Sequence, residues 1–217
     1  MGPKVINLSG GNKRQRILEA AGEVFAEHGF RAVTVREICK LAEANLSAVN
    51  YYFGDKEHLY LAVLKYSFNA AIKKYPPDLG LEPGASAEQQ LQAFILSLLL
   101  RILDEGRPAW HGKLMAREMI EPTPTLDVMI EEAFRPLFKQ LTSIVKDILS
   151  DNISLEELKL CQASIIGQCL FYYHARPVIS RMIPEQKYGR EDIEKLAEHI
   201  TRFSLAALEK LRTKCFT

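Results

Sequence analysis

The sequence lacks a hydrophobic run long enough to cross a membrane, although 47% of its 217 residues are hydrophobic. A transmembrane helix needs about 18 or more predominantly apolar residues in succession. The first residues also lack the apolar segment of a signal peptide. The hydrophobic content therefore predicts a globular core, and we expect a cytoplasmic protein.

Recognisable metal, disulfide and catalytic patterns are also missing. The four cysteines, Cys39, Cys161, Cys169 and Cys215, form no C-x-x-C pair, and we interpret them as small hydrophobic side chains in a reducing compartment. The five histidines form no zinc motif, and the sequence contains no G-x-S-x-G, phosphate loop or dinucleotide fingerprint. An acid–base pair of His111 and Glu118 is the remaining catalytic alternative. We therefore predict a protein that is not an enzyme and binds no cofactor or metal.

A strong excess of positive charge is absent too, because the formal net charge is only +1. The distribution is more informative than the total. The first 56 residues carry eight Lys and Arg against six Asp and Glu, while the remainder is slightly acidic. This mild asymmetry favours contact with nucleic acid by the N-terminal part of the chain.

Apolar residues recur at helical spacing along almost the whole chain, and the alternation typical of strands is nearly absent. The sequence therefore predicts an all-α fold of about nine main helices. We expect helices over residues 13–28, 34–43, 45–53, 56–75, 86–105, 109–121, 125–149, 154–174 and 190–214, with a short extra turn at 176–183. Two proline-containing stretches, 76–77 and 83–84, mark a loop between the predicted helices 56–75 and 86–105.

The stretch 34–56 has the layout of a helix-turn-helix. Thr34 is a good N-cap with Glu37 at the capping-box position, and Asn45 caps the second helix. The first turn of that second helix is small or apolar, which lets its backbone approach the bases of DNA closely. Its first-turn residues are Leu46, Ser47 and Ala48.

The rest of the second helix offers groups that can contact the bases and the phosphates of DNA. Asn50 can pair with an adenine through two hydrogen bonds, while Tyr51, Tyr52 and Lys56 can contact phosphates. Two adjacent tyrosines point about 100° apart on a helix, so they cannot both be core residues. Packed tyrosines and an Asn50 that contacts no base remain alternatives. Val49 and Phe53 supply the apolar back face.

Residues 13–64 resemble the DNA-binding domain of the TetR family of transcriptional regulators. The resemblance rests on ILEAAGEVFAEHGF (17–30), TVREICKLAEAN (34–45) and AVNYYFGDKEHLY (48–60), in order and spacing. It implies DNA contacts from Thr34, Val35, Arg36, Leu46, Ser47, Ala48, Asn50, Tyr51, Tyr52 and Lys56. Two positions depart from the common pattern, because Glu43 replaces a turn glycine and Asn50 replaces a frequent tyrosine. We expect a slightly different turn geometry and an altered base preference.

The resemblance also implies a homodimer through the predicted helices 154–174 and 190–214. The sequence agrees, because the second of these helices has an apolar stripe that is wide for one intramolecular contact. The predicted dimer residues are Ala163, Ile166, Gly167, Leu170, Ile193, Ala197, Ile200, Phe203, Ala207 and Leu211. Ordinary core helices in a monomer are the alternative.

An aromatic and methionine-rich set of residues could line an effector pocket. Its members are Phe94, Trp110, His111, Met115, Phe134, Phe171, Tyr172 and His174. The same set could equally be a packed core. Further polar candidates are Arg117, Glu118 and Arg176. The runs HGKLMAREMIEPTPTLD (111–127) and FYYHARPVI (171–179) resemble the C-terminal domain of CecR-like members of the TetR family, from which no ligand can be inferred.

These observations predict a cytoplasmic homodimer that represses transcription at a palindromic operator and is released by a small hydrophobic or amphipathic effector. We expect a flexible arm over residues 1–12, a DNA-binding domain over 13–56, and an effector-binding and dimerisation domain over 57–217. The predicted helix 57–75 links the two domains. A DNA-binding regulator without a small-molecule effector, switched by a protein or constitutive, is the alternative.

Overall fold

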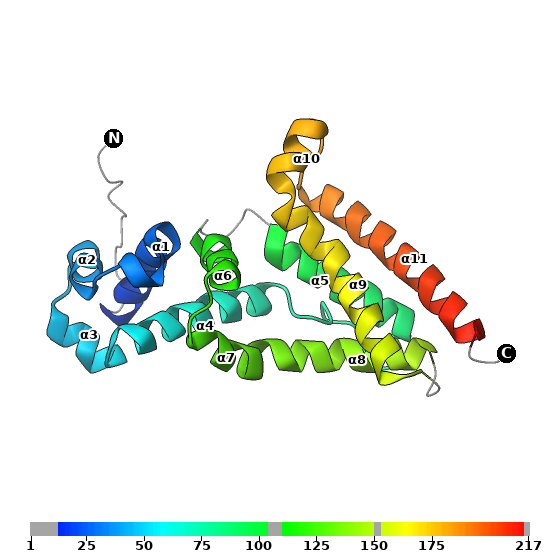
Figure 1. The fold of residues 1–217 in the computed structure, drawn as a ribbon, viewed down its shortest axis with the longest axis horizontal. Helices are drawn as coiled ribbons and strands as arrows, with labels where there is room; N and C mark the ends of the chain where they lie inside the picture. The colour runs from blue at the N-terminus through cyan, green and yellow to red at the C-terminus, as the bar shows by residue number, and fades with distance from the viewer. Residues whose placement is uncertain (1–12, 104–109, 150–152, 215–217) are drawn as a thin grey trace. The chain divides into compact units, whose positions relative to one another are not determined.

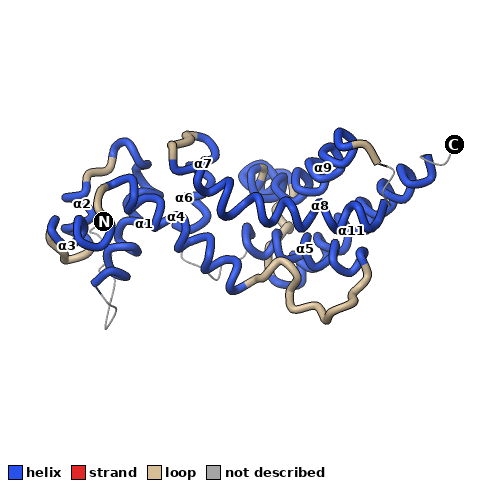
Figure 2. The backbone as a smooth tube through the Cα atoms, turned by 90° about the horizontal axis from the view of Figure 1, so that it is seen from below, coloured by secondary structure: helices blue, strands red, loops and turns tan. Residues whose placement is uncertain are grey.

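The computed structural model describes residues 13–103, 110–149 and 153–214, and every regular element in these ranges is helical (Figure 1). The helices are α1 (Lys13–Ala32), α2 (Val35–Leu41), α3 (Leu46–Phe53), α4 (Lys56–Lys74), α5 (Ala87–Leu103), α6 (Trp110–Ile120), α7 (Thr125–Met129), the π-helical turn η1 (Ile130–Phe134), α8 (Arg135–Leu149), α9 (Leu155–His174), α10 (Arg176–Met182) and α11 (Arg190–Lys214). The predicted all-α fold is confirmed (Figure 2). The predicted arm 1–12 lies outside the described residues. Within the described ranges, no helix combines the length and apolar character needed to cross a membrane.

Packing divides the chain into two compact units. The first unit combines residues 1–70 with residues 108–133, so α6 and α7 belong with the helix-turn-helix. The second unit combines residues 71–107 with residues 134–217 and contains α5 and α8 to α11. The boundary expected after residue 56 divides the chain by the predicted function of its parts. The two units are defined instead by the contacts between residues. Helix α4 contributes residues to both units.

Local capping explains where the first helices begin and end. Gly29 has φ 80° and ψ 163°, which interrupts α1 close to its predicted end. The capping box of α2 is formed, since the Thr34 hydroxyl accepts a hydrogen bond from the Glu37 amide at 3.3 Å and the Thr34 amide donates to Glu37 Oε2 at 2.7 Å. Asn45 Oδ1 accepts from the Ala48 amide at 2.8 Å at the start of α3. The sequence predicted all three of these boundaries.

The turn between α2 and α3 contains a residue in the left-handed conformation. Glu43 has φ 49°, where a side chain is disfavoured and glycine is not. The turn is held by a hydrogen bond from the Ala44 amide to the Cys39 carbonyl oxygen at 2.9 Å. Glu43 therefore adopts a conformation suited to the glycine that it replaces in the common pattern, at some cost in stability.

We predict that Glu43→Gly raises the free energy of unfolding by about 0.5–1 kcal/mol, because it relieves the left-handed strain. The lost partner is minor, since Glu43 is exposed and its oxygen lies 3.9 Å from the Arg16 guanidinium. Urea denaturation checks the change. Glu43→Ala is the matched control, because it removes the same ion pair but keeps a Cβ, and it should give no gain. Equal stability of the two variants would contradict the explanation by strain.

The predicted helix 125–149 is interrupted by the π-helical turn η1 between α7 and α8. A π turn inserts one extra residue into a helix, and the spacing of the apolar residues does not reveal this insertion. Glu132 in this turn forms an ion pair with Lys65 of α4 at 2.5 Å. The short extra turn expected at 176–183 is a helix of seven residues, α10.

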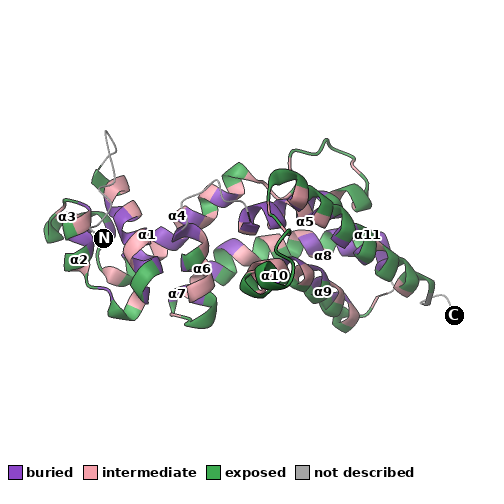
Figure 3. Ribbon diagram, turned by 90° about the horizontal axis from the view of Figure 1, so that it is seen from above, coloured by how far each residue is buried: buried purple, intermediate pink, exposed green. Residues whose placement is uncertain are grey.

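The second unit has a continuous apolar core in which α5 is packed against α8, α9 and α11 (Figure 3). Its buried residues include Leu91, Phe94, Ile95, Leu99, Leu141, Ile144, Ile165, Ile193, Ala197, Ile200 and Leu208. Cys169 is buried in it, and burial raises the pKa of its thiol to about 12. A thiol with so high a pKa is unreactive at neutral pH, as expected of a small hydrophobic residue. Cys215 lies outside the described residues.

Candidate functional site

The two faces of α3 differ sharply in burial. Val49 and Phe53 are buried against the first unit, as predicted for the back face. Tyr51 is 83% exposed and Tyr52 is 36% exposed, and their rings meet edge to face at 5.0 Å between centroids. The alternative that these tyrosines are packed core residues is therefore wrong. Asn50 is exposed beside them.

The other predicted DNA contacts also lie at the surface of the first unit. Leu46, Ser47, Thr34 and Arg36 are exposed, and Ala48, Val35 and Lys56 are half-buried. They come from the start of α2, from α3 and from the first residue of α4. The first amides of a helix have no acceptor within it, so the starts of α2 and α3 can bind phosphate oxygens.

Thr34 has a structural role beside its predicted contact with DNA. Its hydroxyl donates to Glu37 Oε2 at 2.9 Å, and its amide donates to the same oxygen. The amide and hydroxyl of Thr34 hold the pKa of the Glu37 carboxyl below its usual value. The Thr34 hydroxyl already caps α2, so a phosphate bound by Thr34 would have to use the same hydroxyl.

Lys56 also contacts the protein itself. Its ammonium lies 4.5 Å from the centroid of the Phe30 ring and donates to the Arg31 carbonyl oxygen at 3.5 Å. Both partners lie just after the break in α1 at Gly29. The sequence motif indicated the charge of Lys56 but not this contact, which depends on how α4 packs beside the end of α1.

Glu118 was a polar ligand candidate on sequence grounds, and the structure gives it another role. Its carboxylate is fully buried and accepts hydrogen bonds from the Tyr60 hydroxyl at 2.7 Å, the Thr123 amide at 2.9 Å and the Thr123 hydroxyl at 2.9 Å. Burial and the bond to Glu118 raise the pKa of Tyr60. The network joins α6 to α4 and to the turn before α7, which accounts for Glu118 without a catalytic role.

The predicted ligand residues of α6 pack within the first unit. Trp110 and His111 are buried, and their rings lie 6.4 and 6.0 Å from the Tyr66 ring of α4. The Trp110 ring also fills the space where a Cβ on Gly22 of α1 would lie, with ring atoms 2.5 Å from that position. Met115 is half-buried on the same helix. These contacts attach α6 to α1 and α4.

The other members of the predicted ligand set belong to the second unit. Phe94 is part of its core, Phe134 and Tyr172 are half-buried, and Phe171 and His174 are exposed. Phe171 and Tyr172 line an open groove of about 340 Å³ with Gly167, Gln168, His199 and Ile200. The predicted set is thus divided between the two units.

The predicted dimer residues separate into two groups. Ile193, Ala197 and Ile200 are each only 1% exposed and belong to the core of their own unit. Their assignment to a dimer interface is corrected, because a 3–4 residue spacing turns all three inward. Ala163, Gly167, Phe203 and Ala207 are exposed, and Ile166, Leu170 and Leu211 are half-buried. These seven residues form the outer face of α9 and α11. Exposed Leu160, which was not among the predicted site residues, and exposed Phe171, which was predicted as a ligand residue, add to the apolar surface of α9.

Comparison with known proteins identifies the family. Residues 17–63 match the model of the bacterial regulatory proteins of the tetR family. Residues 87–208 match the C-terminal domain of the HTH-type transcriptional dual regulator CecR. The chain belongs to the TetR family and is a DNA-binding transcriptional regulator, not an enzyme. Within that family it has a CecR-type C-terminal domain, as the sequence resemblance predicted.

Curated relatives match along nearly their whole length. The transcriptional dual regulator CecR of Shigella flexneri is 25% identical over 209 residues, covering 93% of each chain. The transcriptional repressor NicS of Pseudomonas putida is 31% identical over 209 residues, covering 92% of each chain.

Solved structures share the fold. A tetR-family regulatory protein from Rhodococcus RHA1 has a TM-score of 0.65 at 20% identity, covering 90% of this chain and 96% of that one. AibR, in complex with isovaleryl coenzyme A and operator DNA, has a TM-score of 0.65 at 14% identity, covering 88% and 97%.

Proposed function

We propose that this protein is a homodimeric repressor that binds a palindromic operator and is released from it by a small-molecule effector. The observation that carries the DNA-binding part is the exposed face of α3, on which Asn50, Tyr51 and Tyr52 lie opposite buried Val49 and Phe53. This arrangement leaves the polar side chains available to a DNA groove while the apolar ones fix the helix. The name of NicS, a transcriptional repressor, supports repression rather than activation.

Asn50 and Lys56 should affect DNA binding in different ways. We predict that Asn50→Ala reduces discrimination at one base pair by about 1–3 kcal/mol, because the bidentate contact is lost. Lys56→Ala should weaken binding to all sequences alike and reduce the salt slope by about one. Selection of operators from a random DNA pool, followed by fluorescence anisotropy at several salt concentrations, measures both effects.

Because Lys56 also contacts Phe30, the thermal stability of each variant is measured in parallel. If the two variants lost the same affinity on every sequence, this would contradict the division between Asn50 as a base contact and Lys56 as a phosphate contact. Failure of the wild-type protein to enrich any palindrome would overturn the proposal of an operator-binding dimer.

The outer face of α9 and α11 supports the dimer. Phe203 is 61% exposed there, and Gly167 has open space where a Cβ would lie, so another helix can approach closely. A dimer also places two recognition helices on two half-sites, which raises affinity and fixes their spacing.

We predict that Phe203→Glu raises the dimer dissociation constant about 100-fold or more, since it places a charge in an apolar interface. Analytical ultracentrifugation measures the constant. Arg202→Glu is the matched control, because the neighbouring side chain is exposed and points about 100° away on α11. A Phe203→Glu protein that remains as dimeric as the control would show that α11 does not form the interface through this face.

Effector binding is supported by the family and by AibR, whose structure holds both isovaleryl coenzyme A and operator DNA. Helix α4 begins at the helix-turn-helix and ends in the second unit, so it is suited to carry a change from one to the other. A regulator without an effector is the second candidate. It is favoured by the burial of Trp110 in the first unit and of Phe94 in the second, since each ring is already packed within its own unit. Titration of the operator complex with candidate ligands separates the two.

A further inference from the structure

Two basic side chains from different helices bind the backbone of one short segment at the end of α1, residues 27–31. Arg117 of α6 donates from Nη2 to the Glu27 carbonyl oxygen at 3.2 Å. Lys56, the first residue of α4, donates to the Arg31 carbonyl oxygen at 3.5 Å. All of these residues belong to the first unit. The segment 27–31 therefore connects α6 to the start of α4.

Arg117 approaches the break in α1 closely. Its Nη1 lies 2.6 Å from the position that a Cβ on Gly29 would occupy, and Gly29 has φ 80°. Carbonyl groups in the last turn of a helix lack amide partners within it, and an arginine can donate to them. The Glu121 side chain, 3.8 Å from Arg117 on the same helix, is largely exposed, so that ion pair is weak. The main structural role of Arg117 is therefore to cap α1 from a neighbouring helix.

The residues just after this break hold Lys56 in place. Its ammonium lies 4.5 Å from the centroid of the Phe30 ring, and that ring packs on Tyr60 of α4 with centroids 5.0 Å apart. An ammonium has three donor hydrogens, so its bond to the Arg31 carbonyl oxygen leaves donors for a phosphate. Contacts that already fix a flexible lysine reduce the conformational entropy that it loses on binding.

We propose that Arg117 is a positioning residue for Lys56: by capping α1 at Glu27, it fixes the segment 27–31 against which the Lys56 ammonium is held. The helix α6 contributes none of the predicted DNA contacts, so an effect of Arg117 on DNA binding runs through Lys56. The structural part of the proposal concerns the first unit alone. Its consequence, a stronger phosphate contact by Lys56, rests on the proposed function.

Hydrogen exchange of the full-length protein, followed by mass spectrometry, tests the structural part without DNA. In Arg117→Gln we expect the amides of residues 27–31 to exchange at least threefold faster than in the wild type. The amides of α3 should exchange as before, whereas a general loss of stability would affect both segments. Lys113→Gln is the matched control, because it removes the same charge from an exposed position on α6 and should leave exchange over 27–31 unchanged.

A double-mutant cycle with Lys56→Ala, measured by fluorescence anisotropy on the selected operator, tests the effect on DNA. Arg117→Gln should weaken binding about three- to tenfold and equally on all sequences, since the contact concerned is to phosphate. In the Lys56→Ala background the same change should cost less than twofold, because no ammonium is left to position. Lys113→Gln should cost less than twofold in both backgrounds, which measures the effect of removing a charge from α6.

Arg117→Lys is the second variant, and it keeps the cycle usable if Arg117→Gln does not fold. It retains the positive charge but replaces the planar guanidinium with a single ammonium, which cannot both donate to Glu27 and cover Gly29 in the same way. We expect a smaller loss of operator affinity than for Arg117→Gln, and this loss should again disappear beside Lys56→Ala. If the charge alone were responsible, Arg117→Lys would bind as the wild type does.

Two results would overturn the proposal. One is unchanged exchange over residues 27–31 in Arg117→Gln. The other is an equal loss of operator affinity from Arg117→Gln in both backgrounds, when Lys56→Ala by itself weakens binding. A different result would contradict only the proposed function. If exchange rose in Arg117→Gln but Lys56→Ala left operator affinity and its salt dependence unchanged, the positioning by Arg117 would stand and the phosphate contact assigned to Lys56 would be wrong.

Discussion

Replacing Glu118 with alanine should lower the free energy of unfolding by about 3–4 kcal/mol, the largest effect that we expect from a single substitution. The change would leave the buried Tyr60 hydroxyl and the Thr123 amide without their acceptor and would open a cavity between α6 and α4. Urea denaturation followed by tryptophan fluorescence suits the measurement, because the single tryptophan, Trp110, lies on the same helix.

Glu118→Gln is the matched control for this prediction. A glutamine keeps the volume, its carbonyl oxygen can accept from Thr123, and its amide can donate to the Tyr60 oxygen. We expect it to cost about 1 kcal/mol, the difference between a charge-assisted and a neutral hydrogen bond. If alanine and glutamine were equally destabilising, the negative charge rather than the set of hydrogen bonds would be responsible. A loss below about 1 kcal/mol for alanine would contradict the structural role of Glu118.

Gly22→Ala should also destabilise the first unit, by about 2–3 kcal/mol. Alanine usually stabilises a helix by about 1 kcal/mol relative to glycine. Here its Cβ would lie 2.5 Å from two atoms of the Trp110 ring, so either the ring or α1 has to move, which outweighs the helical preference. Thermal unfolding followed by circular dichroism measures the loss.

The same substitution should change sign when the tryptophan is absent. In a Trp110→Leu background the obstructing ring is removed, and Gly22→Ala should become neutral or stabilising by up to about 1 kcal/mol. The double-mutant cycle therefore isolates the contact between α1 and α6. An equal loss from Gly22→Ala in both backgrounds would show that Trp110 is not the cause.

The sequence was most informative where structure depends on neighbours along the chain. Thr34 and Asn45 were predicted as helix caps, and each accepts the expected hydrogen bond from the amide three residues later. The faces of α3 also follow from its own periodicity, so exposed Tyr51 and buried Val49 could be predicted from spacing alone. These features need no knowledge of which helices pack together.

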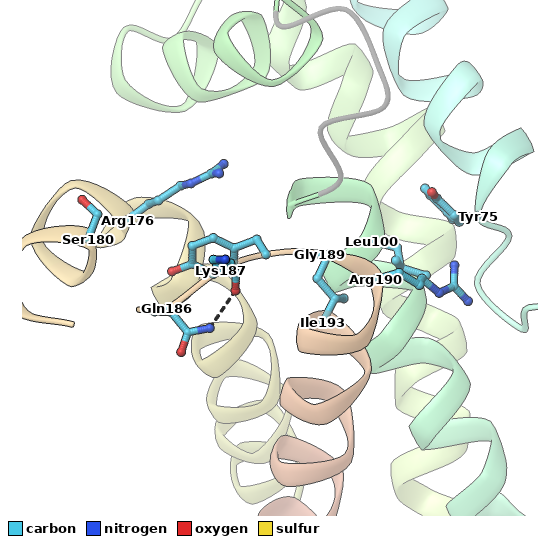
Figure 4. Close-up of a pocket in the computed structure, with 10 residues that line it drawn as sticks. Tyr75, Leu100, Arg176, Ser180, Gln186, Lys187, Gly189, Arg190 and Ile193 are labelled. Carbon is cyan, nitrogen blue, oxygen red and sulfur yellow. Dashed lines mark hydrogen bonds between the residues drawn. The ribbon is translucent and has the colours of Figure 1, made fainter. Parts of the chain in front are cut away.

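Features that depend on distant packing could not be predicted in the same way. Glu118 is a charged residue of a kind that usually lies at the surface or in a ligand site. Only the approach of Tyr60, 58 residues away along the chain, shows why it is buried. The apolar stripe on α11 is wide because it includes both buried Ile193 and exposed Phe203. Spacing alone does not say which of its residues turn to the core. The aromatic residues of the predicted ligand set are as suitable for a core as for a pocket. A cavity of about 610 Å³ in the second unit (Figure 4) is lined partly by the loop after α10, where no periodic pattern exists.

The assembly of the first unit from two separate stretches of chain has a consequence for its synthesis. The ribosome delivers α1 to α4 first, but Gly22 and Tyr60 then lack the partners that α6 brings, because residues 71–107 intervene. Domains fold as they emerge only when their contacting parts have been made. The first unit therefore lacks the contacts of α6 and α7 until residue 133 has left the exit tunnel, by which point most of the chain has been translated.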